Sequence, residues 1–308
     1  MLRRVLLAAS ASPRLRQVIT TAPATRAIVD SYVAGETADD AVRVTRTLRA
    51  AGLLVSLDYL GEDTKDLAQA AAVAEEYVQL LGKLAAEGLT HGGAAEVSVK
   101  LTAVGLYLGT AVAAENIRRI AAAAREAGTT VTLDAEEHAA IEPTLRIAAD
   151  LRAEYADLGC VIQACLRRSE ADCESLAGHG VRVRLCKGAY SEADSVAFTA
   201  RRDVDASYAR CVRTLMNGPG YPMLATHDPR LIEITSALAV LNGRASGSFE
   251  YQMLYGIRPA EQRRLANTGA RMRVYVPYGG DWYAYLVRRL AERPANLAFF
   301  LRSLRSNT

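Results

Sequence analysis

Polar and ionisable residues lie within or directly after the short apolar runs of this sequence, and their types suit both proton transfer and the binding of small charged ligands. In chain order they are Asp58, Lys100, Asp134, Gln163, Lys187, Thr226, His227, Glu250, Gln252 and Tyr275. A polar residue at the end of a strand is also what a solvated loop produces, and for Asp58 both interpretations stay open. If the runs are parallel strands, their ends meet at one edge of the sheet, and these side chains would form one site.

Two of these residues belong to a scarce type. The sequence contains 33 arginines but four lysines, namely Lys65, Lys83, Lys100 and Lys187. A lysine at a strand end is therefore less easily explained by chance, because active sites gather ionisable groups. Lys100 and Lys187 are candidates for binding an anion or for forming a Schiff base. Gly188, which follows Lys187, would let the backbone approach a flat or phosphorylated ligand.

A second group of residues lies near the carboxyl terminus. Tyr285, Arg288, Arg289 and Glu292 have the spacing i, i+3, i+4, i+7, which places them on one face of a helix. A solvated surface face explains this spacing as well, with Arg289 and Glu292 as an exposed pair. The loop before this helix should bring it over the strand ends, where two arginines can bind one carboxylate. Together with Lys100 they describe a site for a small carboxylic acid.

Eight β-rich runs alternate with helical stretches along the chain. The runs are 53–57, 97–100, 131–134, 160–165, 181–186, 223–226, 249–253 and 274–277, and the helical stretches include 39–51, 66–87, 113–127, 194–216, 230–241 and 284–304. This alternation predicts an α/β fold with a parallel sheet and right-handed crossovers. Eight units, and no Gly-x-Gly-x-x-Gly after a strand, favour a closed (β/α)8 TIM-like barrel over an open doubly wound sheet. We expect residues 1–52 to form N-terminal flanking helices and residues 53–308 to form the catalytic barrel.

The composition excludes several other classes of protein. The 308 residues are half apolar and 23% charged, which is unlike a disordered chain. A net charge of +3 without a polybasic block argues against nucleic acid as a partner. Five cysteines without metal-ligand spacing indicate reduced thiols in the cytoplasm and no metal site. No apolar run approaches the ~20 residues that cross a bilayer.

The amino terminus allows two further interpretations. Residues 1–29 contain five arginines and no acidic residue, which is typical of a transit peptide but also fits an outer helix. The short basic and apolar segment 2–7 would allow peripheral contact with a membrane, although stretches of this length usually pack on their own protein.

The residues at the strand ends belong to motifs that resemble the proline dehydrogenase family, specifically its shorter monofunctional bacterial members. The motifs touch all eight runs in order: YVAGET at 32–37, DYLGE at 58–62, VSVKL at 97–101, LDAE at 133–136, VIQA at 161–164, RLCKGAY at 184–190, ATHD at 225–228, FEYQML at 249–254, and the stretch 275–292. Ser191 and Asp228 differ from the long bifunctional relatives and fit the monofunctional branch. The resemblance implies a distorted (β/α)8 barrel that binds FAD without a Rossmann fold.

The resemblance also implies a set of flavin contacts. Gln163, Arg184 and Lys187 match contacts to the ring system and the ribityl chain, and a cation such as Arg184 near the flavin would stabilise the more negative reduced ring. The full set of cofactor-binding residues implied in this way is Ala135, Gln163, Arg184, Lys187, Gly188, Ala189, Thr226, His227 and Glu292, with Thr226 and His227 on the adenosine side.

The resemblance implies L-proline as the substrate. The family residues that bind its carboxylate are matched here by Lys100, Arg288 and Arg289. Asp134, Leu254, Tyr275 and Tyr285 match the residues that shape the pocket around the ring, and Asp134 and Tyr275 are expected to hydrogen-bond to each other. Glu62 matches an acidic residue that can pair with Arg288 and close the pocket. The catalytic set implied by the resemblance is Lys100, Asp134, Tyr275, Arg288 and Arg289.

The implied reaction transfers a hydride from the proline carbon next to nitrogen to the flavin, gives 1-pyrroline-5-carboxylate, and is followed by reoxidation by a quinone. The product would pass to a separate pyrroline-5-carboxylate dehydrogenase, since 308 residues leave no room for that second domain. The substrate amine must lose a proton, and either L-proline binds as the free amine or Lys100 assists. The sequence leaves both routes open.

Two other functions compete with this interpretation. A Schiff-base aldolase or lyase would use Lys100 or Lys187 at a strand end, but it has no need of Gln163 and Arg184. A flavin-binding or degenerate barrel that senses proline without turnover is disfavoured by the completeness of the site, in which the arginine pair and the lysine are intact.

Overall fold

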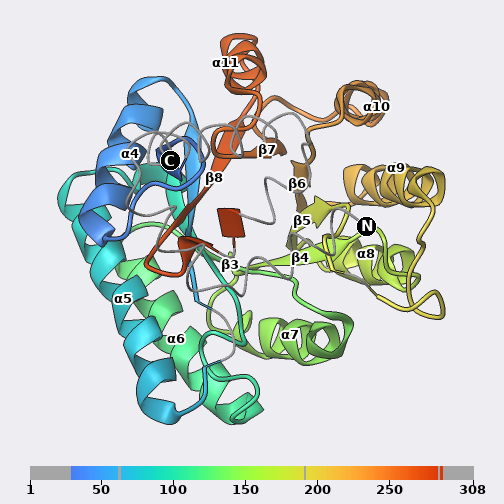
Figure 1. Ribbon diagram of the computed structural model, residues 1–308. Helices are drawn as coiled ribbons and strands as arrows, with labels where there is room; N and C mark the ends of the chain where they lie inside the picture. Colours follow the sequence, from blue (N-terminus) through green and yellow to red (C-terminus); the bar gives the residue numbers. More distant parts are fainter. Residues whose placement is uncertain (1–28, 62–63, 191, 284, 287–308) are drawn as a thin grey trace, which may run out of the picture.

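The computed structural model describes residues 29–61, 64–190, 192–283 and 285–286. Within these residues the chain forms a closed barrel of parallel strands that follow one another in chain order around the ring (Figure 1). The last strand pairs with the first over the register Leu54–Tyr59 against Arg273–Tyr278, which closes the ring. The predicted (β/α)8 fold is therefore confirmed.

The strands of the barrel agree closely with the predicted runs. They are β1 Leu54–Tyr59, β2 Ala95–Val99, β3 Val131–Leu133, β4 Gly159–Gln163, β5 Arg182–Cys186, β6 Tyr221–Ala225, β7 Glu250–Leu254 and β8 Met272–Tyr278. Because right-handed crossovers join parallel strands in chain order, all eight carboxyl ends lie at the same mouth of the barrel.

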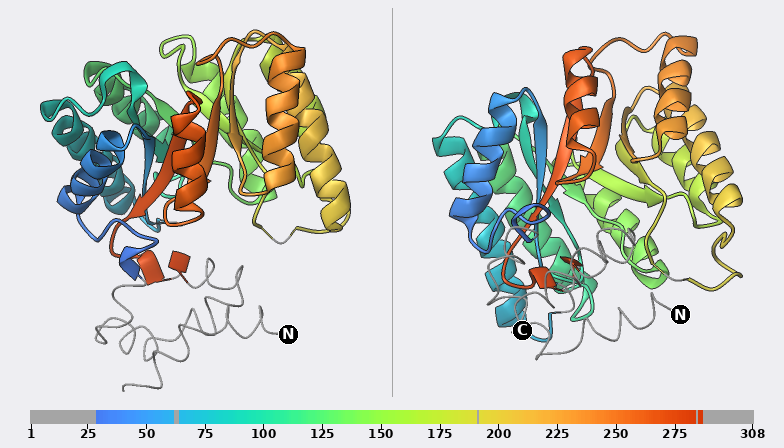
Figure 2. Two further views of the ribbon diagram at one scale, coloured as in Figure 1. Left: turned by 90° about the horizontal axis from the view of Figure 1, so that it is seen from above. Right: turned by 45° about the horizontal axis from the view of Figure 1, so that its top comes forward.

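Helices surround the strands on the outside of the barrel (Figures 1 and 2). The described helices are α4 Ala38–Ala50, α5 Leu67–Ala86, η1 His91–Gly93, α6 Thr110–Glu126, α7 His138–Leu151, α8 Ser169–Gly178, α9 Arg201–Asn217, α10 Pro229–Leu241 and α11 Pro259–Asn267. Among these helices none is both long enough and apolar enough to span a membrane. The helix expected at 284–304 lies outside the described residues except at positions 285 and 286, which are helical.

One predicted helix begins later than expected. The periodicity predicted a helix from residue 194, but α9 begins at Arg201. The preceding residues instead bind the loop after β4: the amide of Phe198 donates to the carbonyl of Cys165 at 2.7 Å, and the amide of Arg167 donates to the carbonyl of Val196 at 2.9 Å. These hydrogen bonds satisfy the backbone outside a helix, which overrides the local helical propensity.

Alternation along the strands separates an apolar outer face from a polar interior. In β1, Val55 and Leu57 are fully buried in the core between strands and helices, while Ser56 and Asp58 point to the other face. Full burial of one such aliphatic side chain stabilises the fold by about 2 kcal/mol. The layer between the strands and the helices is thus the main hydrophobic core, and the barrel interior is left to polar groups.

The segment before β1 connects the outside of the barrel to the loop after β8. Helix α4 begins at a capping box in which the hydroxyl of Thr37 accepts from the amide of Asp40, and the helix packs against β1, β8 and α5. The indole of Trp282 donates to Glu36 at 2.9 Å, and the amide of Gly279 donates to the carbonyl of Gly35 at 2.9 Å. These contacts fix the start of the stretch that leads to Tyr285. The proposed boundary between residues 52 and 53 stays a prediction.

Candidate active site

Polar side chains recur at every second position of several strands, so they share the barrel interior. They are Ser56 and Asp58 of β1, Glu96 and Ser98 of β2, Arg182 and Arg184 of β5, Glu250 and Gln252 of β7, and Arg273 and Tyr275 of β8. Aliphatic residues usually fill the interior of such a barrel. Buried charge is costly unless it is paired, so the pairing of these groups defines the site.

Arg184 lies at the centre of this interior, with 4% of its side chain exposed. Its Nη1 donates to Ser98 Oγ at 2.7 Å and to Asp134 Oδ1 at 2.8 Å. Its Nη2 donates to Ser56 Oγ at 3.0 Å and to Glu96 Oε1 at 3.4 Å. The guanidinium is therefore held by four side chains from β1, β2 and the end of β3, and it cannot turn without breaking several hydrogen bonds.

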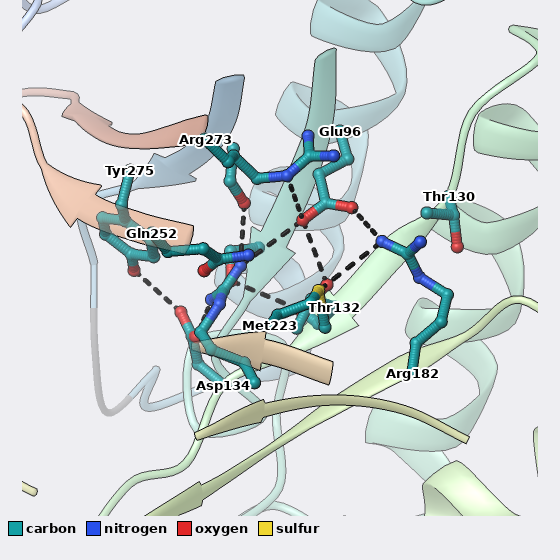
Figure 3. Close-up of polar contacts among 12 residues, drawn as sticks. Glu96, Thr130, Thr132, Asp134, Arg182, Met223, Gln252, Arg273 and Tyr275 are labelled. Carbon is teal, nitrogen blue, oxygen red and sulfur yellow. Dashed lines mark hydrogen bonds and ion pairs between the residues drawn. The ribbon is translucent and has the colours of Figure 1, made fainter. Parts of the chain in front are cut away.

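Asp134 and Tyr275 form the hydrogen bond that the sequence predicted. The hydroxyl of Tyr275 donates to Asp134 Oδ2 at 2.7 Å (Figure 3). The Arg184 guanidinium lies 5.3 Å from the centre of the tyrosine ring. Burial, together with the negative charge of Asp134, raises the pKa of Tyr275 well above its ordinary value. Tyr275 therefore remains a hydrogen-bond donor at neutral pH.

Lys100 and Asp58 form a second pair at the same mouth. The Lys100 Nζ lies 2.7 Å from both carboxylate oxygens of Asp58, and the side chains are 12% and 2% exposed, respectively. Burial raises the pKa of the Asp58 carboxyl, and the charge of Lys100 opposes that shift. The sequence left open whether Asp58 is a solvated loop residue. Its side chain is buried and contacts Lys100, so it is not one.

Beneath these pairs lies a lower layer of charged residues (Figure 3). Arg273 donates to Glu250 from Nε at 2.6 Å and from Nη2 at 3.1 Å, and Arg182 donates to Glu96 at 2.8 Å. Burial acts to raise the pKa of Glu250, but the charge and hydrogen bonds of Arg273 outweigh it and lower that pKa to about 2. The sequence analysis missed Glu96, Arg182 and Arg273, although the polar alternation along β2, β5 and β8 was a signal for them.

The loop after β5 carries Lys187 and Gly188 at one side of the mouth. Lys187 Nζ pairs with Asp205, and it lies 3.1 Å from Asp228 Oδ2. The hydrogen bond from Arg230, helped by Lys187, holds the pKa of Asp228 well below its usual range. Lys187 thus faces the outer rim of the mouth rather than its centre.

The backbone of Gly188 lies so close to Cys165 and Gln163 that a larger residue at this position would displace these neighbours. Its φ is +100°, and a Cβ there would come within 2.3 Å of Cys165 Sγ and 3.0 Å of Gln163 Oε1. The amide of Gln163 is in turn fixed by a 2.6 Å hydrogen bond from Nε2 to the carbonyl of Glu136. A glycine here keeps Gln163 in place.

The remaining predicted residues are spread around the rim. His227 Nε2 accepts from the amide of Leu254 at 3.0 Å, and this hydrogen bond links the ends of β6 and β7. Thr226 Oγ1 accepts from the amide of Asp228 at 3.1 Å within the loop after β6. Leu254 packs against the buried cluster that includes Tyr285. Ala135 packs against the cluster that contains Cys165, and Ala189 is exposed. Glu62, Arg288, Arg289 and Glu292 lie outside the described residues.

The site has the donors and the backbone freedom that a flavin needs. Within the described part of the chain, Arg184 Nε is a buried donor without a hydrogen-bond partner. Buried donors are nearly always satisfied, so this atom suits an acceptor atom of a ligand. The positive φ of Gly188 leaves the loop backbone open to close approach. Both features fit a flat, acceptor-rich ring at the mouth.

A closed parallel barrel with paired ionisable groups at the carboxyl ends of its strands defines a barrel enzyme, since active sites of this fold lie there. Residues 41–302 match the family model described as proline dehydrogenase. The chain belongs to the proline dehydrogenase family, as the resemblance implied. Its members are oxidoreductases, which contradicts the alternative of a Schiff-base aldolase built on Lys100 or Lys187.

Individual relatives agree with this assignment. The chain is 39% identical over 304 residues to proline dehydrogenase 1 of Bacillus subtilis strain 168, covering 99% of each chain. It is 37% identical over 282 residues to proline dehydrogenase of Deinococcus radiodurans, covering 90% of each. These two relatives have nearly the length of this chain.

Longer proteins share the same barrel. The crystal structure of proline utilization A (PutA) from Bdellovibrio bacteriovorus inactivated by N-propargylglycine has a TM-score of 0.82 and 26% identity. The match covers 92% of this chain and 34% of that chain. The chain thus spans about a third of the structure it resembles.

Proposed function

We propose that the chain is an FAD-dependent L-proline dehydrogenase that produces 1-pyrroline-5-carboxylate. The observation that carries the proposal is the centre of the mouth: Arg184, fixed by Asp134 at 2.8 Å, with a buried Nε left for a ligand acceptor. Cations and donors held in this way stabilise negative charge that develops on a bound ring during reduction. Membership in the family supports the same conclusion.

The cofactor would be held by residues from the ends of β3, β4, β5 and β6 and the loops that follow them, together with Glu292. When bound, FAD supplies a two-electron acceptor that takes a hydride from carbon. Gln163, Arg184 and Gly188 are proposed to contact its ring region, and Lys187 to contact the chain that follows. Thr226 and His227 would line its adenosine side, with Ala135, Ala189 and Glu292 as further contacts.

The substrate would bind beside the cofactor through its carboxylate. Lys100 supplies one cation at the mouth, and we propose that Arg288 and Arg289 supply two more. Asp134 and Tyr275 would form one wall of the pocket, and Leu254 and Tyr285, which contact the same apolar cluster, would form another. We propose that Glu62 pairs with Arg288 when the pocket closes.

The pairing of Lys100 bears on the proton that the substrate amine must lose. Lys100 already donates to both carboxylate oxygens of Asp58 at 2.7 Å, so we propose that it binds the substrate carboxylate and does not remove the proton. We therefore propose that L-proline reacts as the free amine. Loss of the hydride from the ring carbon next to nitrogen, which bound FAD would accept, would convert the free amine into a protonated carbon–nitrogen double bond. Loss of the remaining N–H proton to water would then give 1-pyrroline-5-carboxylate.

The acceptor and the downstream enzyme follow from the same proposal. A quinone would reoxidise the reduced cofactor. PutA of Escherichia coli is described as bifunctional, and this chain covers 25% of it at 28% identity, so the second activity belongs to other parts of that protein. We propose that a separate pyrroline-5-carboxylate dehydrogenase consumes the product. The proposed location is the cytoplasm, with peripheral contact to the membrane that holds the quinone.

The test is an anaerobic visible spectrum of the purified protein before and after addition of L-proline, with D-proline as the control. We expect a yellow protein that L-proline alone bleaches and that a soluble quinone analogue recolours. A colourless protein that takes up no added FAD would contradict the proposed cofactor. A yellow protein that L-proline does not bleach would contradict the proposed substrate.

A further inference from the structure

One carboxylate in the lower layer, that of Glu96, lies among three guanidinium groups. Its oxygens lie 2.8 Å from Arg182 Nη2, 3.4 Å from Arg184 Nη2 and 3.7 Å from Arg273 Nε, and the side chain is fully buried. Thr132 Oγ1 donates to the same carboxylate at 3.2 Å. Figure 3 shows Glu96 between Arg182 and Arg273. A buried charge in this position acts on all of its neighbours, because little water screens it.

The three arginines depend on Glu96 to different degrees. Arg273 has a carboxylate of its own, since Glu250 accepts from two of its nitrogen atoms. Among the described residues, Arg182 has Glu96 as its ion-pair partner. Arg184 shares Glu96 with Arg182 and has a second carboxylate in Asp134. The negative charge of Glu96 is therefore divided mainly between Arg182 and Arg184.

Arg184 connects this lower layer to the mouth of the barrel. Its Nη2 contacts Glu96 below, its Nη1 contacts Asp134 above, and its Nε is a buried donor without a hydrogen-bond partner among the described residues. A change in the charge or position of Glu96 would thus reach the side chain that we propose contacts the cofactor ring, through one guanidinium group.

We infer that Glu96 is a positioning residue that holds Arg184 from below and lowers the reduction potential of the bound flavin. This inference rests on the proposed function, because it concerns the flavin of that site. A negative charge close to Arg184 offsets part of the guanidinium charge, so it reduces the stabilisation of the more negative reduced ring. Arg182 limits this effect because it neutralises part of Glu96.

The experiment measures the midpoint potential of the bound flavin by anaerobic titration in the wild type and in Glu96→Gln and Arg182→Gln. Glu96→Gln removes the negative charge beside Arg184, so the potential should rise. Arg182→Gln removes the competing cation and leaves Glu96 to Arg184, so the potential should fall. Glu250→Gln is the matched control, because Glu250 is equally buried but its partners are Arg273, Tyr221 and Gln252. Its shift should be smaller than that of Glu96→Gln.

The opposite signs separate this role from a purely structural one. A general loss of packing would move both variants in the same direction, and that result, or the absence of any shift, would overturn the inference. Equal shifts in Glu96→Gln and Glu250→Gln would overturn it as well. If Glu96→Gln does not fold, Arg182→Gln decides alone, since its side chain is at the edge of the interior, 18% exposed.

The wild type distinguishes a failure of this inference from a failure of the proposed function. If the wild type binds flavin and L-proline bleaches it, unchanged potentials in the variants count against Glu96 alone. If the wild type binds no flavin, the proposed function is contradicted, and this inference is contradicted with it.

Discussion

At the scale of single residues, the site is organised by pairs in which each buried charge has a fixed partner. Asp134 joins Arg184 and Tyr275, and Asp58 joins Lys100. Pairing matters because an unpartnered charge in this interior is far more costly than the same charge at the surface. Lys100 and Arg184 are thus each held by a carboxylate of their own.

The pair of Asp58 and Lys100 leads to a prediction about stability. Asp58→Asn and Lys100→Met each leave one buried charge without its partner and should each lower the free energy of unfolding by about 3 kcal/mol. The double variant removes both charges, so its loss should be clearly smaller than the sum of the single losses. Urea unfolding of the four proteins measures this, and strictly additive losses would contradict the pairing.

The lowered pKa of Glu250 leads to a prediction about the free energy of unfolding at low pH. Its pKa falls from 4.5 to about 2 in the fold, so the ionised form contributes stability at neutral pH that is lost as the pH drops from about 5 towards 2. The advantage of the wild type over Glu250→Gln should therefore shrink by about 3 kcal/mol across that range. Urea unfolding at stepwise lower pH checks this.

The comparison with the variant is necessary because Asp58 acts in the opposite direction. Its raised pKa means that the folded state binds its proton more tightly, so protonation of Asp58 favours the fold at low pH. A difference between wild type and Glu250→Gln that stays constant with pH would contradict the pairing of Glu250 with Arg273.

At the scale of elements, the loop after β5 places a glycine where a side chain would disturb the site. Gly188→Ala brings a Cβ into Cys165 and Gln163 at a φ of +100°, so it should lower the free energy of unfolding by about 2–3 kcal/mol and weaken FAD binding at least about tenfold. Urea unfolding and an FAD fluorescence titration measure both effects.

Gly180→Ala is the matched control for this prediction. Gly180 also has a positive φ, +68°, but a Cβ there meets nothing within 4 Å. It should lose about 1 kcal/mol of stability and keep its FAD affinity. Equal effects of the two substitutions on FAD binding would show that Gly188 has no special place near the cofactor.

The elements also show how much the sequence could predict. All eight strands were found because their apolar runs and the helical stretches between them are local patterns. The start of α9 was wrong because residues before Arg201 bind the loop after β4, which is distant in sequence. The lower layer was missed for the same reason: Arg182 and Glu96 are 86 residues apart, and only closure of the barrel brings such partners together.

The same distinction between local patterns and contacts distant in sequence applies to the site residues. The strand-end positions of Lys100 and Asp134 could be predicted, since a parallel barrel gathers strand ends at one mouth. The resemblance to the family predicted the hydrogen bond between Asp134 and Tyr275. The pairing of Asp58 with Lys100 was not predicted, because a strand-end carboxylate has the same sequence signature as a solvated loop.

At the scale of the whole molecule, the barrel reverses the usual division between apolar interior and polar surface. The aliphatic core lies between strands and helices, and the barrel interior holds charged residues (Figure 3). This division lets the outer layer stabilise the fold while the interior supplies fixed charges for chemistry. The central claim is that L-proline binds and reacts at this mouth.

The most direct test of that claim is the concentration of L-proline that gives half the maximal rate of anaerobic flavin bleaching. In Lys100→Met this concentration should rise about 10- to 100-fold, because a charge-assisted hydrogen bond to the carboxylate is lost. Lys83→Met is the control, since Lys83 lies on the exposed side of α5 and pairs with Asp39. It should behave as the wild type. A wild-type concentration dependence in Lys100→Met, with flavin bound, would contradict the assignment of this mouth as the proline site.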